Sequence, residues 1–119
     1  MKYMLLIHQG EAPTPQSPEE WARVPEEEQK AVYADYKAVS ETPGVTPGLG
    51  LAAPETATTV RVQDGKTLTT DGPFVTVKEA LGGYLFVEAD DLDAAVELAS
   101  RIPAARMGGA VEVRPVVER

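Results

Sequence analysis

The sequence predicts an α+β fold of the ferredoxin-like kind, a split βαβ pattern in which an antiparallel sheet carries two helices on one face. Three observations predict it. Two apolar, strand-like runs stand at residues 3–8 and 83–89. Each is followed by a segment with helical spacing, and turn signals divide the residues between them. A last strand at residues 110–117 completes the order strand, helix, strands, strand, helix, strand.

The N-terminal third predicts a central strand and a long helix. Residues 3–8 are apolar on both alternating faces, as expected of a strand in the middle of a sheet. Residues 17–20 (Ser-Pro-Glu-Glu) resemble a capping box with proline at the first helical position. Pro25 restarts or kinks this helix, which should end near Glu41 and bury the set at helical spacing, Val32, Tyr36 and Val39.

The middle of the chain predicts short strands joined by tight turns. Residues 45–53 contain one proline and two glycines, which favours an irregular edge strand. Asp64-Gly65 is typical of a two-residue hairpin turn between strands at residues 56–63 and 66–70. A rigid turn follows Asp71, because Gly72 permits a positive φ and the next residue is proline.

The C-terminal third predicts a strand, a helix and a final strand. Residues 83–89 form the second central strand. Asp90-Asp91 should cap a helix with the apolar face Leu92, Ala95, Val96 and Ala99. Pro115 indicates that the final strand lies at an edge of the sheet or ends there.

Composition narrows the class of protein. A chain of 119 residues predicts one domain, residues 1–119, and a net charge of −8 argues against nucleic acid and anionic membranes as partners. The absence of cysteine excludes disulfides and thiolate metal sites, and a single histidine argues against a transition metal. The apolar run at residues 4–7 is too short for a signal peptide or membrane span, so we expect a cytoplasmic protein. No phosphate-binding loop or zinc spacing is present, and we expect no cofactor.

Several short motifs occur together in one order along the chain. They are Asp-Gly-Pro-Phe at 71–74, Leu-Gly-Gly-Tyr at 81–84, Asp-Asp-Leu-Asp-Ala-Ala at 90–95, Pro-Ala-Ala-Arg at 103–106 and Val-Glu-Val-Arg-Pro at 111–115. With the N-terminal strand, this set resembles the DGPF-domain branch of the YCII-related family. The resemblance implies a ferredoxin-like domain that pairs with a second copy into a dimeric α+β barrel. It also implies that this homodimer is a bacterial cytoplasmic protein. It also implies a link to sigma-factor signalling, since some members are encoded beside extracytoplasmic-function sigma factors.

Strand alternation sorts the side chains into two faces. Leu5, Leu85 and Val113 should pack beneath the helices. The opposite, bare face should carry the polar set His8, Tyr84, Glu88, Glu112 and Arg114. In the ferredoxin-like order, the end of the first strand meets the starts of the other two. His8, Tyr84 and Glu112 are therefore expected to converge beside Asp71.

His8 and Asp71 are the candidate catalytic residues. His8 could transfer a proton as a base that Asp71 orients, because the unperturbed pKa of histidine lies near neutrality. Each has a structural alternative. His8 could be a satisfied histidine at a strand end, and Asp71 could bond its own backbone in an Asx turn.

Tyr84, Glu112, Arg114 and Phe74 are the candidate ligand contacts. Tyr84 could instead pack in a core or dimer interface. Glu112 and Arg114, two residues apart on one strand face, could form an anion clamp or pair with each other or across a dimer.

Three functions follow from this pattern. The first is a protein that binds an unknown small molecule, and it is the one we favour. The second is a small cofactor-free enzyme that uses acid–base chemistry in the barrel cavity. The third is a pure dimerisation domain. The sequence leaves the first two open.

Overall fold

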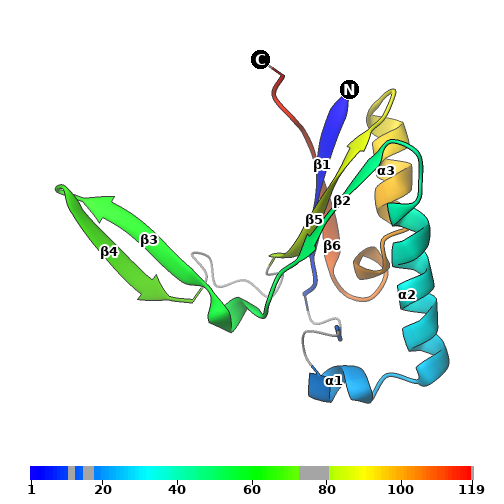
Figure 1. Cartoon of the computed structure of the whole chain (residues 1–119), viewed down its shortest axis with the longest axis horizontal. Helices are drawn as coiled ribbons and strands as arrows, with labels where there is room; N and C mark the ends of the chain where they lie inside the picture. Colours follow the sequence, from blue (N-terminus) through cyan, green and yellow to red (C-terminus); the bar gives the residue numbers. More distant parts are fainter. Residues whose placement is uncertain (11–12, 15–17, 73–80, 119) are drawn as a thin grey trace.

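An antiparallel sheet with its helices on one face organises the chain (Figure 1). This computed structural model describes residues 1–10, 13–14, 18–72 and 81–118. Its elements are β1 (Lys2–His8), α1 (Pro18–Ala22), α2 (Glu26–Ser40), β2 (Val45–Gly50), η1 (Pro54–Thr56), β3 (Thr58–Gln63), β4 (Lys66–Asp71), β5 (Leu81–Glu88), α3 (Leu92–Ser100), η2 (Pro103–Ala105) and β6 (Ala110–Pro115). The predicted α+β class and order of elements are confirmed.

Four strands form the main sheet in the order β2-β5-β1-β6, and every pair is antiparallel. Strand β1 lies inside the sheet, between β5 and β6, as its doubly apolar pattern predicts. Strands β2 and β6 are the two edges. This agrees with the irregular edge strand predicted near Pro47 and with the ending of β6 at Pro115.

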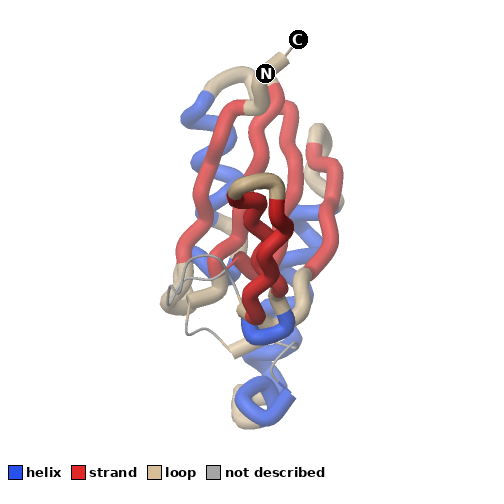
Figure 2. The backbone as a smooth tube through the Cα atoms, turned by 90° about the vertical axis from the view of Figure 1, so that its left-hand side faces the viewer, coloured by secondary structure: helices blue, strands red, loops and turns tan. Residues whose placement is uncertain are grey.

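The helices α2 and α3 cover one face of this sheet and leave the other without a helix (Figures 1 and 2). The hydrophobic core lies between them. It contains Tyr3, Leu5, Ile7, Val39, Leu85, Val87, Ala95, Leu98, Ala99, Ile102 and Ala104. Val113 packs partly buried against this cluster, so the predicted helix-side set of Leu5, Leu85 and Val113 is confirmed.

The hairpin β3–β4 forms a second, two-stranded sheet of its own. Its turn places Asp64 at φ 51° and Gly65 at φ 75°, the left-handed pair that a two-residue Asp-Gly turn requires, and this confirms the predicted hairpin. Figure 1 shows the hairpin extending away from the main sheet. The side chains of Val60, Val62 and Leu68 are all exposed on it. The alternating pattern gave no indication that these strands would leave the main sheet.

Pro25 separates two helices. It is the N-cap of α2, with an extended φ of −55° and ψ of 142°, and α1 ends three residues before it. The side-chain amide of Gln29 donates to the carbonyls of Trp21 and Val24 at 2.8 and 3.0 Å. These bonds satisfy backbone carbonyls at the C-terminal end of α1 and connect α1 to α2. Ser17, the predicted cap of α1, lies outside the described residues.

Helix α3 begins at the predicted cap but buries a different face. The Asp91 carboxylate accepts a hydrogen bond of 2.9 Å from the Ala94 backbone, as expected for an N-cap. The predicted apolar face is wrong at two positions, because Leu92 and Val96 are 53% and 48% exposed. The buried stripe is Ala95, Leu98, Ala99 and then Ile102. The four share the i, i+3, i+4, i+7 spacing of one helix face.

In the part of the chain that the structure describes, no helix combines the length and the apolar character needed to cross a membrane.

Candidate functional site

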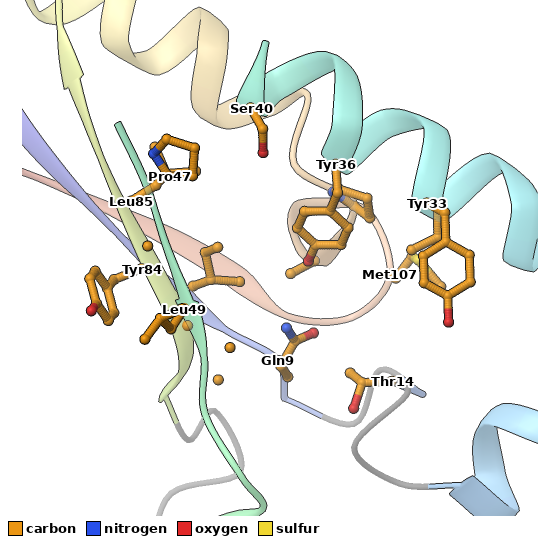
Figure 3. Close-up of a pocket in the computed structure, with 18 of the residues that line it drawn as sticks. Gln9, Thr14, Tyr33, Tyr36, Ser40, Pro47, Leu49, Tyr84, Leu85 and Met107 are labelled. Atoms are coloured by element: carbon orange, nitrogen blue, oxygen red, sulfur yellow. The ribbon is translucent and has the colours of Figure 1, made fainter. Parts of the chain in front are cut away.

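A pocket lies between helix α2 and one end of the main sheet (Figure 3). Its volume is about 290 Å³. Tyr33 and Tyr36 come from α2, Gln9 follows β1, Leu49 belongs to β2 and Met107 follows η2. Trp21 of α1 also lines it, and its ring meets that of Tyr33 edge to face at 5.7 Å.

Glycines at the strand ends leave the space for this pocket. The pairing of β2 with β5 shifts register between Pro47 and Gly50, so the sheet is irregular here. Gly83 of β5 is buried and lines the pocket, on the same face as Leu85. A Cβ at Gly83 would meet nothing closer than the Leu49 carbonyl oxygen at 3.4 Å, which is ordinary contact. A longer side chain would extend from there among pocket-lining residues.

Tyr36 and Gln9 form the polar end of the pocket. Figure 3 shows the amide of Gln9 directed toward the phenol of Tyr36. Burial raises the pKa of Tyr36 above its usual value, while a hydrogen bond with Gln9 and the positive charge of Arg106 act in the opposite direction. Arg106 itself is held at the surface by an ion pair of 2.5 Å with Asp35 on α2. Tyr36 therefore stays a neutral hydroxyl at physiological pH.

His8 and Glu112 meet on the face of the sheet that carries no helix. His8 Nε2 lies 3.3 Å from Glu112 Oε1, and the other oxygen of Glu112 lies 3.6 Å from Arg114 Nε. Strand pairing explains the contact, because β1 aligns His8 with Ala110 and Leu6 with Glu112. The His8 side chain is 23% exposed and that of Glu112 is 48% exposed. A histidine beside a carboxylate is an arrangement that can accept and hold a proton.

Of the remaining predicted site residues, Tyr84 shares the helix-free face with His8 and Glu112, whereas Asp71 does not. Tyr84 on β5 pairs with Leu6 on β1 and borders the pocket. Its ring packs edge to face on that of Phe86, with 6.1 Å between the ring centroids. Its ring is drawn on the side of the strands away from Tyr36 (Figure 3). Asp71 is exposed at the end of β4, in the two-stranded sheet, and not in the sheet that carries His8. Phe74 lies outside the described residues.

Gly72, directly after Asp71, has the predicted positive φ. The rest of the predicted turn lies outside the described residues. Gly72 adopts φ 99°, a left-handed value that favours glycine. Its N–H donates to the Ala57 carbonyl at 2.7 Å, and its carbonyl accepts from the Thr59 hydroxyl at 2.8 Å. Both bonds lead to the segment around β3, so Gly72 attaches the end of β4 to that segment.

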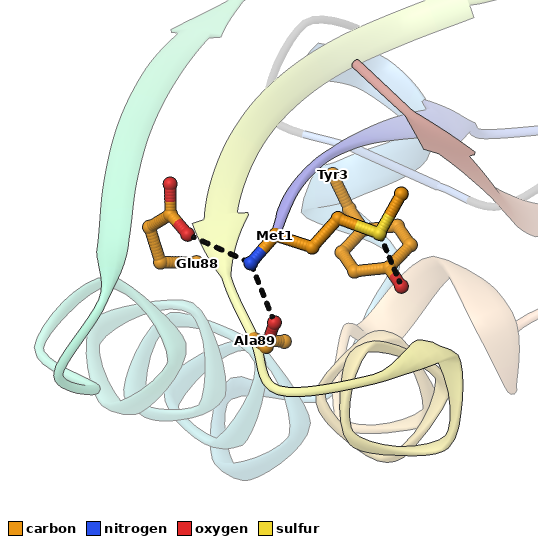
Figure 4. Close-up of polar contacts among 4 residues, drawn as sticks. All are labelled: Met1, Tyr3, Glu88 and Ala89. Atoms are coloured by element: carbon orange, nitrogen blue, oxygen red, sulfur yellow. Dashed lines mark hydrogen bonds and ion pairs between the residues drawn. The ribbon is translucent and has the colours of Figure 1, made fainter. Parts of the chain in front are cut away.

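Glu88, predicted for the bare face, has a structural role at the opposite end of the sheet (Figure 4). Its carboxylate lies 3.2 Å from the N-terminal ammonium group, which also donates to the Ala89 carbonyl at 3.1 Å. These contacts attach the start of β1 to the end of β5. Among the described residues, no group of three or more potential ligands gathers to hold a metal ion.

The sequence prediction missed the pocket residues Gln9, Tyr36 and Trp21 as a group. They lie on separate elements, and only packing brings them together. The one available signal was the pair Gly82-Gly83 in an otherwise apolar strand, since glycine within a strand often marks a close approach or a hollow.

The fold and pocket define an α+β domain with a small cavity between its helices and its sheet. The chain matches the YCII-related domain over residues 1–119. It is also similar to a protein of Rhizobium meliloti (strain 1021) described as uncharacterised, with 31% identity over 121 residues that cover 98% of this chain and 92% of that protein. The chain belongs to the YCII-related family.

The raised pKa of Tyr36 predicts a loss of stability in alkali. An unfolded tyrosine ionises near pH 10, whereas folded Tyr36 keeps its proton to a higher pH. The contribution of protonated Tyr36 to the free energy of unfolding is complete below pH 10, and it is lost as the pH rises through the pKa of Tyr36 in the folded protein. We expect Tyr36→Phe, which cannot ionise, to lose less stability than the parent protein between pH 9 and pH 11 in urea titrations. An equal loss in both proteins would contradict the assignment.

Proposed function

We propose that this chain is a small-ligand-binding protein of the YCII-related type, with its ligand in the pocket beneath α2. The observation that supports this proposal is the pocket itself. Its volume of about 290 Å³ is at the lower end of the range for small-molecule sites, and its wall is mostly apolar with a few polar groups. Those polar groups come from separate elements that the fold holds in place, which is how proteins orient a small molecule.

We further propose that the protein is a ferredoxin-like homodimer of the dimeric α+β barrel type. The strand order β2-β5-β1-β6 and the two helices on one face support this topology. The helix-free face bears Met4, Leu6, Tyr84 and Phe86. An apolar sheet face of this kind is normally covered, and a second copy of the chain is the simplest cover.

The Asp-Gly-Pro-Phe sequence at residues 71–74 supports membership of the DGPF-domain branch. By that resemblance we propose that the protein acts in the bacterial cytoplasm, in circuits linked to extracytoplasmic-function sigma factors. The net charge of −8 is consistent with this proposal, because it disfavours direct binding to nucleic acid.

A second candidate function is a cofactor-free enzyme that uses acid–base chemistry on the helix-free face. The contact of 3.3 Å between His8 and Glu112 favours it. In this proposal His8 is the base and Glu112 is the carboxylate that orients its ring, in place of Asp71. If neither ligand nor substrate is found, the chain is a dimerisation domain alone.

The ligand-binding proposal predicts that filling the pocket abolishes binding. A thermal-shift screen of metabolites should raise the melting temperature of the parent protein, since a ligand stabilises the state that binds it. Gly83→Leu should lose the shift for every true hit, because its side chain enters the pocket. Gly83→Ala is the matched control and should keep most of it. A hit that binds Gly83→Leu as tightly as the parent lies elsewhere, and a screen with no Gly83-dependent hit contradicts the function.

The dimer proposal predicts sedimentation at twice the mass of the chain at micromolar concentration. An obligate interface of this type buries on the order of 2,000 Å² or more in total. Leu6→Lys, on the helix-free face, should produce monomers. Leu49→Lys is the control, because Leu49 is 72% exposed on an edge strand. A parent protein that sediments as a stable monomer would exclude the barrel.

The acid–base proposal predicts a specific pattern for any compound that the protein converts. His8→Ala should slow turnover by roughly 10²–10⁴-fold, the usual contribution of a general base. Glu112→Gln should also slow turnover, because it removes the carboxylate that orients the histidine ring. Binding in the pocket under α2 should remain unchanged in both variants. Turnover at the parent rate in His8→Ala would leave His8 as a structural residue.

A further inference from the structure

The pocket beneath α2 has no charged lining among the residues that the structure describes. This is notable in a chain with 19 acidic and 11 basic residues. An ion that entered the pocket would lose hydration without meeting a lining residue of opposite charge, and the nearby Arg106 is already paired with Asp35. Anions face the additional repulsion of a protein whose net charge is −8. The wall therefore selects against ionic ligands.

The size of the pocket sets the size of the ligand. Its volume of about 290 Å³ is roughly twice that of the cavity of about 150 Å³ that holds a benzene molecule in an engineered protein. Three aromatic rings, those of Trp21, Tyr33 and Tyr36, contribute to the wall. Aromatic rings pack well against other rings, edge to face or offset. One ring or two fused rings fit these dimensions.

The polar end of the pocket offers a hydrogen-bond donor. Figure 3 shows the Gln9 amide directed toward the Tyr36 phenol, where its N–H group can donate to the phenol oxygen. The hydroxyl proton of Tyr36 is then free to point toward a second acceptor. Burial keeps that proton on the oxygen, because it opposes ionisation.

Gly82 keeps Gln9 in this position. A Cβ at Gly82 would lie 2.4 Å from Cγ of Gln9, so any other residue would displace the Gln9 side chain. The glycine pair thus has two separate consequences. Gly83 leaves room for the ligand, and Gly82 leaves room for the amide that orients the Tyr36 hydroxyl.

We propose that this pocket takes an uncharged aromatic compound of one or two rings, whose oxygen accepts a hydrogen bond from the Tyr36 hydroxyl. The proposal rests on the ligand-binding function above and specifies its ligand class. It assigns Tyr36 as the residue that selects for the oxygen, with Gln9 as the residue that positions it.

Three probes of the same shape test the proposal. They are 2-acetylnaphthalene, which is neutral with an acceptor oxygen, naphthalene-2-carboxylate, which is an anion, and 2-ethylnaphthalene, which has no polar group. Binding is followed by calorimetry and by the fluorescence of Trp21, the only tryptophan in the chain and a residue of the pocket wall. We expect the ketone to bind at least tenfold more tightly than the carboxylate and several-fold more tightly than the ethyl compound.

Two matched variants locate the donor. Tyr36→Phe should remove the preference for the ketone over the ethyl compound, while the affinity for the ethyl compound stays unchanged and reports an intact pocket. Tyr33→Phe makes the same chemical change on the same helix, at a ring that is 53% exposed, and should keep the preference. Gly82→Ala should weaken the preference by displacing Gln9.

Each contrary result overturns a defined part of the proposal. A carboxylate that binds as tightly as the ketone refutes the selection against charge, although ligand binding itself would stand. Equal binding of ketone and ethyl compound, or a preference that survives Tyr36→Phe, refutes the role of Tyr36. If none of the probes binds, the ligand class is wrong. The Gly83-dependent metabolite screen decides separately whether the pocket binds any ligand.

Discussion

The pairing of β1 with both neighbouring strands determines which face of the sheet each of its side chains occupies. Its register with β5 and β6 buries Tyr3, Leu5 and Ile7 beneath the helices. The alternate residues must then lie on the other face, because successive side chains in a strand point to opposite sides. A slip of one residue would expose three core side chains and bury His8. The hydrophobic core and the His8–Glu112 contact therefore depend on the same register.

Much of this could be predicted from the sequence, because alternation is a local property. It correctly put Leu85 and Val113 under the helices and brought His8 to Glu112. Asp71 was a different problem. An Asp-Gly hairpin has the same pattern whether its strands join the main sheet or form their own, and here they form their own. The sequence pattern does not distinguish a hairpin in the main sheet from a separate one. It therefore could not establish whether Asp71 would approach His8.

The error in α3 and the missed pocket have separate physical causes. Leu92, Ala95, Val96 and Ala99 also follow helical spacing, but the stripe that begins at Ala95 continues through Leu98 to Ile102 and faces the sheet. Choosing between two overlapping stripes requires knowledge of where the sheet lies. The pocket requires more, since Gln9, Tyr36 and Trp21 are brought together by packing between elements. A glycine pair shows that space exists but not which side chains surround it.

The two candidate sites meet at one end of β1, where a register irregularity falls between Ile7 and His8. His8 lies on the helix-free face, and the next residue, Gln9, lines the pocket on the helix side. Consecutive residues thus serve opposite faces of one sheet. The uncharged pocket suits recognition of a neutral ring, and the histidine–carboxylate contact suits proton transfer. Because the sheet lies between them, we expect a substitution within one site to leave the side chains of the other in place. The proposed binding in the pocket and the proposed acid–base chemistry on the helix-free face should therefore be separable by mutation.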